Sequence, residues 1–263
     1  MAEPRKSRQV GLARALSKLG YCSRSDAFAL IRAGRVQLNG RVLRNPETPV
    51  RLETDRITVN SQAITSVAKI YLMMNKPRGI VTTASDEKNR ETVYGLLGKE
   101  LPWVAPVGRL DKASEGLLLF TNDSEWGANV IAPETHLDKT YHVQIATVAT
   151  EDLLQSLRAG VVIDSRERLR VKSAHVLRGG GKNSWLEIVL DEGKNRHIRK
   201  LMEQLGIEVL RLVRVAIGPL VLGNLAKGQI RPLTNDEKQR MDAAMQQSLK
   251  RIDQPKKVAK PDA

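Results

Sequence analysis

A charged loop between two glycines holds the first side chain that could do chemistry. Residues 108–116 read Gly-Arg-Leu-Asp-Lys-Ala-Ser-Glu-Gly, and the apolar run Leu117–Phe120 follows directly. Such a run predicts a buried strand, so the loop would present the carboxylate of Asp111 at the mouth of a sheet, where a catalytic group can meet a substrate. The alternative is structural, because an Asp in a loop often forms an Asx-turn or a cap.

Tyr141 is a second candidate. Tyr141 and Val143 alternate on one face of an expected strand, so Tyr141 can simply be a core residue. The chain has only four tyrosines, and one that lies beside basic loops could instead stack on a nucleobase. The spacing leaves both interpretations open.

A basic helix within residues 192–202 holds the third candidate. The apolar residues that recur from Ile198 onward give this helix one buried face, while Arg196 and Lys200 lie four residues apart on another. Arg199 lies at the border of the buried face, where a guanidinium suits a fixed carboxylate or phosphate partner. The alternative is a basic helix start that only grips phosphate, which would also indicate RNA binding.

Other common chemistries lack their signatures in the sequence. The histidines show no metal-ligand spacing, and the single cysteine, Cys22, excludes an internal disulfide. There is no nucleophile elbow and no glycine-rich loop for a dinucleotide or a methyl donor. The triplet Gly179–Gly181 lacks the ending of a nucleotide-binding loop and indicates a hairpin turn. We therefore expect chemistry without a metal or an organic cofactor.

The charge of the chain predicts a polyanionic partner. Its 263 residues include 43 Lys and Arg against 29 Asp and Glu, a net charge of +14, and the isoelectric point is near 10.1. Nucleic acid is the commonest such partner, and an anionic membrane surface is the alternative. The sequence has no apolar run long enough to span a bilayer, and it begins with a polar, basic stretch instead of a secretory signal. We therefore expect a cytoplasmic protein without membrane association.

Half of this net charge lies in the first sixty residues, which hold twelve Lys and Arg against five Asp and Glu. That asymmetry predicts a dedicated RNA-binding module at residues 8–62. Residues 63–69 are mostly small and polar and are interpreted as a linker. The basic side chains expected to contact RNA in this module are Arg14, Lys18, Arg24 and Arg35.

Local signals give the module its elements. Apolar residues at helical spacing predict a helix over residues 12–19, and Ser23 is the expected N-cap of a second helix that ends at Gly34. The dipeptide Asn39-Gly40 between alternating apolar residues predicts a β-hairpin. A strand near Arg56–Asn60 closes the unit.

The body at residues 70–234 has the pattern of an α+β domain. Short strands separated by turns, without regular βαβ alternation, favour a mainly antiparallel mixed sheet flanked by helices. The expected elements are strands at Tyr141–Ile145, Trp185–Leu190 and Leu210–Val215 and helices at Glu151–Arg158 and Arg196–Leu205. Residues 235–263 predict a C-terminal helix followed by a disordered basic tail.

Together these motifs resemble the bacterial ribosomal RNA pseudouridine synthases of the RsuA/RluB/RluE/RluF type. The motifs are Asn75-Lys76-Pro77-Arg78-Gly79, Gly108-Arg109-Leu110-Asp111 with Ser114 and Gly116-Leu117-Leu118, Lys139-Thr140-Tyr141, and Asn195-Arg196-His197-Ile198-Arg199. Their order matches the family over nearly all of residues 70–234, and residues 11–60 resemble the alpha-L RNA-binding module that usually precedes this catalytic domain. One departure is His197, because relatives often carry Gln there.

The resemblance implies an isomerase that flips a uridine of ribosomal RNA into its cleft and converts it to pseudouridine without a cofactor. Asp111 would act on the ribose side of the glycosidic bond, as nucleophile or as base at the sugar, and uracil would rejoin through C5. Tyr141 would pack against the base and could help to remove the C5 proton. Arg199 would pair with Asp111 and keep it ionised.

The resemblance also implies supporting residues. Arg109 would support the RNA backbone or fill the space of the flipped base, and Lys76 would belong to the wall behind the loop. The basic residues expected to contact RNA around this site are Lys76, Arg109, Arg196 and Lys200.

Two other functions stay open at this point. A non-catalytic RNA-binding ribosome-assembly factor could carry the same front module, although it would not need the additional body. An RNA methyltransferase would need a glycine-rich donor loop, which the sequence lacks. The stretch from Gly108 to Phe120 looks slightly nearer the large-subunit enzymes, which favours large-subunit RNA. We expect a monomer that acts on ribosomal RNA or on a pre-ribosomal particle.

Overall fold

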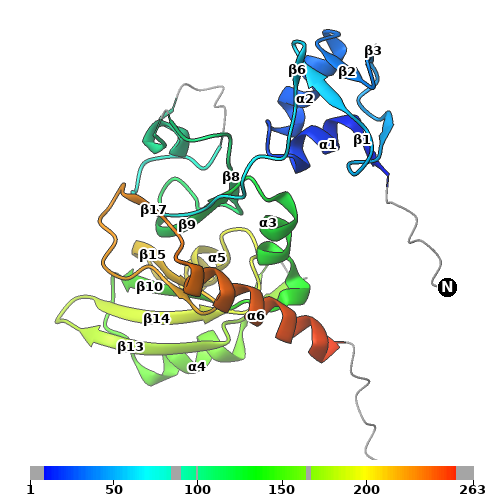
Figure 1. Cartoon of the computed structure of the whole chain (residues 1–263). Coiled ribbons are helices and arrows are strands. Elements are labelled where there is room, and N and C mark those ends of the chain that lie inside the picture. Colours follow the sequence, from blue (N-terminus) through cyan, green and yellow to red (C-terminus); the bar gives the residue numbers. More distant parts are fainter. Residues whose placement is uncertain (1–8, 84–89, 99, 164–166, 253–263) are drawn as a thin grey trace, which may run out of the picture. The chain divides into compact units, whose positions relative to one another are not determined.

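The computed structural model describes residues 9–83, 90–98, 100–163 and 167–252. The chain divides into two compact units. The first comprises Met1–Tyr71, Gly98–Pro106 and Phe120–Gly127, and the second comprises Leu72–Leu97, Val107–Leu119 and Ala128–Ala263. Figure 1 shows both units in sequence colours. Of the expected C-terminal tail, residues 253–263 lie outside the described residues.

Two short helices and small paired strands build the N-terminal part of the first unit. The helices are α1 (Leu12–Lys18) and α2 (Arg24–Arg32). One sheet has the order β3 (Arg41–Val42), β2 (Val36–Leu38), β5 (Ile57–Val59) and β6 (Gln62–Ala63), and β1 (Val10–Gly11) pairs with β4 (Pro49–Val50). Side chains such as Leu16, Ile31 and Val59 are buried in one apolar cluster, so this part of the chain has its own core.

The predicted cap and turn of this part are confirmed. The Oγ atom of Ser23 accepts a hydrogen bond from the Asp26 N–H at 3.0 Å, which satisfies one of the free donors at the start of α2. Asn39 and Gly40 both have positive φ angles, 52° and 82°. Such a backbone forms a two-residue type I′ turn, whose twist matches that of the paired strands.

The segment after β6 has neither helix nor strand over residues 64–70, all of which are described. It is nevertheless anchored within the first unit. The buried side chain of Asn122 accepts from the Ile70 N–H and donates to the Ala68 carbonyl, both at 2.9 Å. Thr121 Oγ1 donates to the Ile70 carbonyl at 2.6 Å. Three hydrogen bonds therefore hold residues 68–70 in place.

The largest sheet in the described residues has nine strands. Its order is β13 (Ser173–Gly179), β14 (Ser184–Leu190), β10 (Lys139–Ile145), β15 (Val209–Ile217), β9 (Glu115–Thr121), β7 (Tyr71–Lys76) and β17 (Ile230–Pro232), with β16 (Leu220–Val221) on β15 and β8 (Ala105–Val107) on β9. The pairs from β13 to β15 are antiparallel, whereas β15 and β9 are parallel. This mixed sheet confirms the predicted α+β fold.

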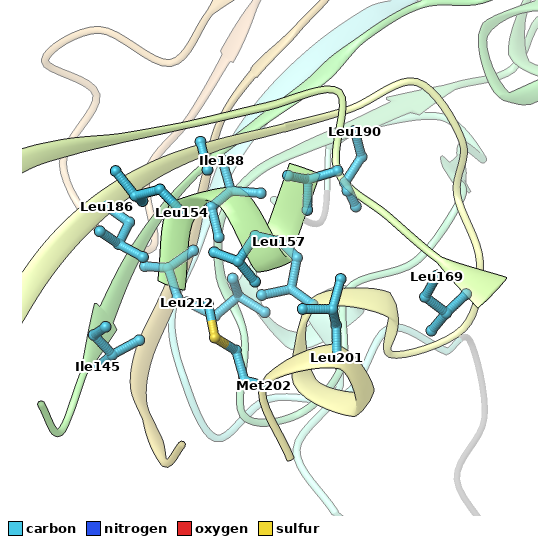
Figure 2. Packing of buried hydrophobic residues seen from close by; sticks show 14 of the residues in the cluster. Ile145, Leu154, Leu157, Leu169, Leu186, Ile188, Leu190, Leu201, Met202 and Leu212 are labelled. Carbon is cyan, nitrogen blue, oxygen red and sulfur yellow. The ribbon is translucent and has the colours of Figure 1, made fainter. Parts of the chain in front are cut away.

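Two helices cover one face of the sheet in the second unit. Figure 2 shows Leu157 of α4 (Glu151–Ala159) and Met202 of α5 (His197–Gln204) packed in one buried cluster with Leu212 of β15. Burying one such side chain contributes roughly 1.5–3 kcal/mol. This apolar layer therefore stabilises the positions of β10, β14 and β15.

The remaining described elements are α3 (Ser124–Ile131), the 3-10 helices η1 (Val93–Leu96) and η2 (Pro133–Thr135), the pair β11 (Val161–Ile163) and β12 (Glu167–Leu169), and α6 (Asn235–Ile252). Strands β13 and β14 form a hairpin at the edge of the sheet (Figure 1). In its turn the Gly180 N–H donates to the Asn183 carbonyl at 2.8 Å, which confirms the turn predicted at the glycine triplet. Within the described ranges, none of the helices has the length and apolar character that crossing a bilayer requires.

Candidate active site

Lys76, the last residue of β7, is fully buried beneath the loop that carries Asp111. Its Nζ atom donates to the main-chain oxygens of Pro77, Asp111 and Ser114 at 3.1, 3.2 and 2.9 Å. Three acceptors match the three donors of an ammonium group, which burial would otherwise leave unsatisfied. Burial lowers the pKa of Lys76 to about 8, while the negative charges of Asp111 and Glu115 oppose the shift. Lys76 therefore holds the loop backbone from inside.

This position contradicts one expectation from the sequence, which predicts RNA contact for Lys76. The side chain is 0% exposed, so its ammonium group has no surface to offer an RNA. The prediction of direct RNA contact is wrong. The apolar run Leu72–Met74, separated from Lys76 by Asn75, is the reason, because its burial draws most of the strand into the interior.

The carboxylate of Asp111 is exposed at the surface of this loop. Thr82 Oγ1 donates to the Leu110 carbonyl at 2.8 Å, and the Ser114 N–H donates to the main-chain oxygen of Asp111 at 3.0 Å. Among the described residues, none donates a hydrogen bond to the carboxylate of Asp111 or forms an ion pair with it. This geometry contradicts the Asx-turn alternative, because the turn uses the main-chain oxygen of Asp111 instead of its side chain.

Asp111 lines a cavity of about 380 Å³ in the second unit. Three other residues that the sequence analysis proposes for catalysis or RNA contact also line it, namely Arg109, Tyr141 and Arg196. Arg109 and Arg196 are exposed, and Arg196 stands at the start of α5 with a left-handed backbone, φ 53°. A cavity of this size can take a ligand as large as a nucleoside.

Tyr141 is both a packed residue of the sheet and a residue of the cavity wall, the two positions that its spacing left open. Its ring is half-buried on β10 and packs beside the apolar cluster behind the sheet. The same residue lines the cavity that contains Asp111. Packing on one side therefore fixes the ring, while the other side can meet a ligand.

Arg199 lies behind the Asp111 loop. Its Nη2 atom donates to the Ala113 carbonyl at 3.0 Å, and its buried Nε atom has no hydrogen-bond partner among the described residues. Burial lowers the pKa of Arg199, and the charge of Asp111 opposes the shift. No ion pair joins Arg199 to Asp111 in the described structure. The direct pairing that the resemblance implies is therefore absent, and Arg199 supports the loop through its backbone instead.

The other predicted RNA contacts are spread over both units. In the first unit Arg14, Arg24 and Arg35 are exposed, whereas Lys18 forms an ion pair with Glu125. In the second unit Lys200 is half-buried on α5 and is not among the residues that line the cavity. Of the exposed cations, Arg35 donates from Nε to Asn60 Oδ1 at 2.7 Å, and its remaining N–H groups can meet a phosphate.

Three cations that the sequence analysis does not propose as site residues also line the cavity, namely Lys139 of β10, Lys194 and Arg214 of β15. Lys194 is paired with Glu192 and Glu167. One signal could have revealed Arg214. In the strand predicted at Leu210–Val215, Leu210, Leu212 and Arg214 alternate on one face. An arginine on an otherwise apolar face of a strand marks either a buried ion pair or a ligand contact.

Glu115, which follows the Asp111 loop as the first residue of β9, has a structural role. It is 2% exposed, and its carboxylate accepts from Arg211 at 3.0 Å through both oxygens and from Lys227 at 2.8 Å. Burial raises its pKa, but the hydrogen bonds from Arg211 and Lys227 outweigh burial and the pKa is lowered. Glu115 is thus fully paired, which leaves Asp111 as the free carboxylate of the loop.

His197 also lines the cavity but is buried, with 3% exposed. Its Nδ1 atom lies 3.8 Å from Oε1 of Glu192, and burial lowers its pKa. A neutral imidazole is therefore favoured at this position. In the part of the chain that the structure describes, no three His, Cys, Asp or Glu side chains gather in a way that could hold a metal ion.

Comparison with known families identifies the fold around this cavity. Residues 70–204 match the family model for RNA pseudouridylate synthase. The chain belongs to the RNA pseudouridine synthase family. Residues 10–57 match the S4 domain, so the synthase combines a catalytic fold with an RNA-binding one. It is an isomerase that acts on RNA.

Relatives of the synthase span nearly its whole length. An uncharacterized RNA pseudouridine synthase of Rickettsia bellii is 40% identical over 223 residues, which cover 85% of this chain and 96% of that relative. Ribosomal large subunit pseudouridine synthase B of Bacillus subtilis is 32% identical over 235 residues, or 88% and 95% of the two chains. A crystal structure of a pseudouridylate synthase superimposes with a TM-score of 0.62 and 28% identity, covering 88% of this chain and 99% of that one. The family and the fold predicted from the motifs are confirmed.

Proposed function

We propose that the synthase converts a uridine of ribosomal RNA to pseudouridine, with Asp111 as its catalytic carboxylate. The observation that carries this proposal is the state of that side chain. Asp111 is exposed, and its carboxylate has no hydrogen bond or ion pair among the described residues. It lines a cavity of nucleoside size, and the neighbouring carboxylate, Glu115, is paired. Its backbone is held by Lys76, so the reactive group is positioned without being neutralised.

The reaction exchanges one bond to the ribose for another. The bond from C1′ to N1 of uracil breaks, the base turns, and a bond from C1′ to C5 forms. C5 loses a proton and N1 gains one, so the atoms balance. Asp111 acts on the ribose side, as nucleophile or as base at the sugar. Tyr141 packs against the base, and the side that faces the cavity is suited to help remove the C5 proton. The product is an isomer of the substrate, so the reaction needs no net oxidant or reductant.

The surrounding arginines play different roles in this proposal. Arg109 and Arg196 are exposed at the cavity and contact the RNA backbone. Arg199 is a positioning residue, because it reaches the loop through the Ala113 carbonyl. The expulsion of the target base from its stack costs a few kcal/mol, which contacts in the cavity must offset.

The proposed substrate is large-subunit ribosomal RNA, free or in a pre-ribosomal particle. Support comes from the Bacillus subtilis relative, whose name specifies the large ribosomal subunit. The enzyme would work as a monomer in the cytoplasm, where ribosomes assemble. We also propose a division of labour along the chain. Residues 8–62 bind the RNA, and residues 63–69 link them to the catalytic domain at residues 70–234. Residues 235–263 form a C-terminal extension.

The experiment that tests this proposal is a map of pseudouridines in ribosomal RNA. A strain that lacks the gene should lose one or a few pseudouridines of the large-subunit RNA. The wild-type gene should restore them, and a gene that encodes Asp111→Asn should not. Unchanged ribosomal modification in the deletion strain would reject the ribosomal substrate, and restoration by Asp111→Asn would reject the catalytic role.

A further inference from the structure

Arg214 is the most deeply buried cation that lines the cavity, with 6% of the residue exposed. Its Nε atom donates to the Leu117 carbonyl at 2.8 Å. Its Nη2 atom is buried and has no hydrogen-bond partner among the described residues. A buried charged donor without an acceptor is unfavourable, so the unpaired Nη2 of Arg214 at a cavity wall indicates a missing ligand.

The backbone is built to bring Arg214 to this wall. A β-bulge shifts the register between β10 and β15, so that Thr140 pairs with Ala216 but Tyr141 pairs with Arg214. Bulges next to active sites commonly re-aim a side chain. Gly116 makes the close approach of β9 possible, because its φ is +103° and a Cβ atom there would lie 2.2 Å from the Arg214 carbonyl oxygen. Arg214 is thus aligned beside Tyr141.

Lys139 joins Arg214 at the same wall. It lies two residues before Tyr141 on the same face of β10 and lines the cavity. Burial lowers the pKa of Lys139, and the positive charge of Arg214 lowers it further. The negative charges of Asp138 and Asp191 act in the opposite direction, and Oδ2 of Asp138 is paired with Lys172 at 2.6 Å. Among the described residues, the Lys139 ammonium has no hydrogen bond or ion pair of its own.

We propose that Arg214 and Lys139 form a phosphate subsite that binds a phosphodiester next to the flipped uridine. The inference rests on the proposed entry of that uridine into the cavity of Asp111. Among the described residues neither cation has a hydrogen bond or an ion pair with a carboxylate, and two such cations at one cavity wall favour an anion over a neutral group. A uracil carbonyl would need only one donor, whereas a phosphate can accept from the guanidinium and the ammonium together. Binding the phosphate beside Tyr141 would fix the ribose relative to Asp111.

The test is a thermodynamic cycle between these side chains and the charge of the RNA backbone. The substrate is a short RNA fragment selected because the wild-type enzyme converts it, whatever its origin, so failure of the ribosomal assignment leaves the test intact. Each phosphodiester flanking the target uridine is replaced in turn by a neutral methylphosphonate. Single-turnover rates are measured for the wild type, Arg214→Gln and Lys139→Met, and affinities are measured for the same substitutions in an Asp111→Asn background. Loss of conversion in Asp111→Asn reports on the catalytic proposal separately.

For the wild type we expect one of the two replacements to lower the rate about 10- to 100-fold, the range for a charge-assisted contact. Each variant should show a similar loss on the natural RNA and less than about 3-fold further loss on the neutral one. If Arg214 had a purely structural role, the rate loss from Arg214→Gln and the rate loss from the methylphosphonate would instead multiply in the combined experiment. Losses in the variants without any effect of either replacement would assign the cations to the base and overturn the phosphate subsite.

Two further measurements keep the outcome clear. Arg214→Gln removes the Nε contact with the Leu117 carbonyl, so its melting temperature is measured. If Arg214→Gln does not fold, the cycle with Lys139→Met alone tests the phosphate subsite. This variant should fold, because the Lys139 ammonium bonds to none of the described residues. The matched control is Arg240→Gln, which removes an exposed cation of α6 paired with Asp236 at 2.8 Å. The control should keep both the wild-type rate and the sensitivity to phosphate charge.

Discussion

The Nζ atom of Lys76 lies 3.2 Å from the main-chain oxygen of Asp111, although 35 positions separate the two residues in the sequence. The ammonium reaches the loop from the interior, while the Asp111 carboxylate faces the outside. A cation that bound the carboxylate directly would tie up the lone pairs that chemistry needs. Binding the backbone instead fixes the position of the carboxylate and leaves its oxygens free.

Replacing Lys76 by Met should destabilise the synthase and disorder the Asp111 loop. Three carbonyls, those of Pro77, Asp111 and Ser114, would lose a buried donor. A buried unsatisfied acceptor costs about 1–3 kcal/mol, and partial relaxation makes about 2–5 kcal/mol the expected total. Denaturant unfolding measures this loss. The exposed Lys112 of the same loop provides the control, because Lys112→Met should change the unfolding free energy by less than about 0.5 kcal/mol.

The stability that Lys76 provides should depend on pH. Its pKa is about 8 in the folded protein, against 10.5 for an ordinary lysine. Between these values the unfolded chain binds more protons at this site, so the free energy of unfolding rises with pH. The slope is at most about 1.4 kcal/mol per pH unit, and Lys76→Met lacks it. The stability difference between wild type and variant should thus be larger near about pH 9.5 than near about pH 7.5, and a difference that stays constant would contradict the burial-lowered pKa.

Asp111→Asn should abolish catalysis and leave the fold intact. The carboxylate is exposed and bonds to none of the described residues, so the free energy of unfolding should change by less than about 0.5 kcal/mol. The single-turnover rate should fall by at least about 1000-fold, while RNA affinity should stay within about 3-fold. Asp236→Asn, which changes an exposed carboxylate of α6, is the matched control. Near-normal turnover by Asp111→Asn would end the catalytic assignment.

Local signals in the sequence were enough to predict some elements of this fold, although others such as α3 and β13 were not predicted. The Ser23 cap and the Asn39-Gly40 turn depend on residues within three positions of each other, and such contacts can be read from spacing. The alternation in β10 and β14 likewise gave strands whose observed ends differ by at most two residues from the prediction. The strand order could not be predicted, because β9 meets β15 through parallel pairing across about a hundred residues.

The candidate site shows the same limit at the level of side chains. The motif spacing pointed to Asp111 and Tyr141, which do share a cavity. It could not reveal that Lys76 is buried or that Arg199 binds a carbonyl, because both depend on how distant strands and loops pack. The apolar alternation before Arg214 is a local signal, but its place beside Tyr141 follows from a bulge in the pairing of two strands, and a single strand's sequence does not contain that register.

Arg199→Ala should weaken the site by loosening the loop. Because Asp111 is exposed, the variant leaves no buried carboxylate unpaired, and the loss should reflect only the contact with the Ala113 carbonyl. We expect about 1–3 kcal/mol of lost stability and a turnover rate that falls by at least about 10-fold with little change in KM. Arg199→Lys should recover only part of the rate, since an ammonium cannot reproduce the planar fork. An Arg199→Ala enzyme with normal turnover would exclude the positioning role.

The last prediction concerns the basic N-terminal part. Residues 1–60 carry half of the net charge, so deleting residues 1–63 should weaken RNA binding without removing the chemical step. If this part contacts about four to six phosphates, the deletion should flatten the slope of log affinity against log salt by roughly three to four. At saturating RNA the truncated enzyme should still turn over, because Asp111, Tyr141 and Arg199 all remain.

A second truncation tests where the catalytic part begins. Deleting residues 1–70 also removes the Ala68 and Ile70 groups that Asn122 and Thr121 hold through three hydrogen bonds. The longer truncation should therefore unfold about 1–3 kcal/mol more easily than the shorter one. Salt titrations, single-turnover assays and denaturant unfolding of both proteins provide the comparison. An unchanged salt slope would show that residues 1–63 are not the electrostatic anchor, and a folded but inactive shorter truncation would show that they help to build the active site.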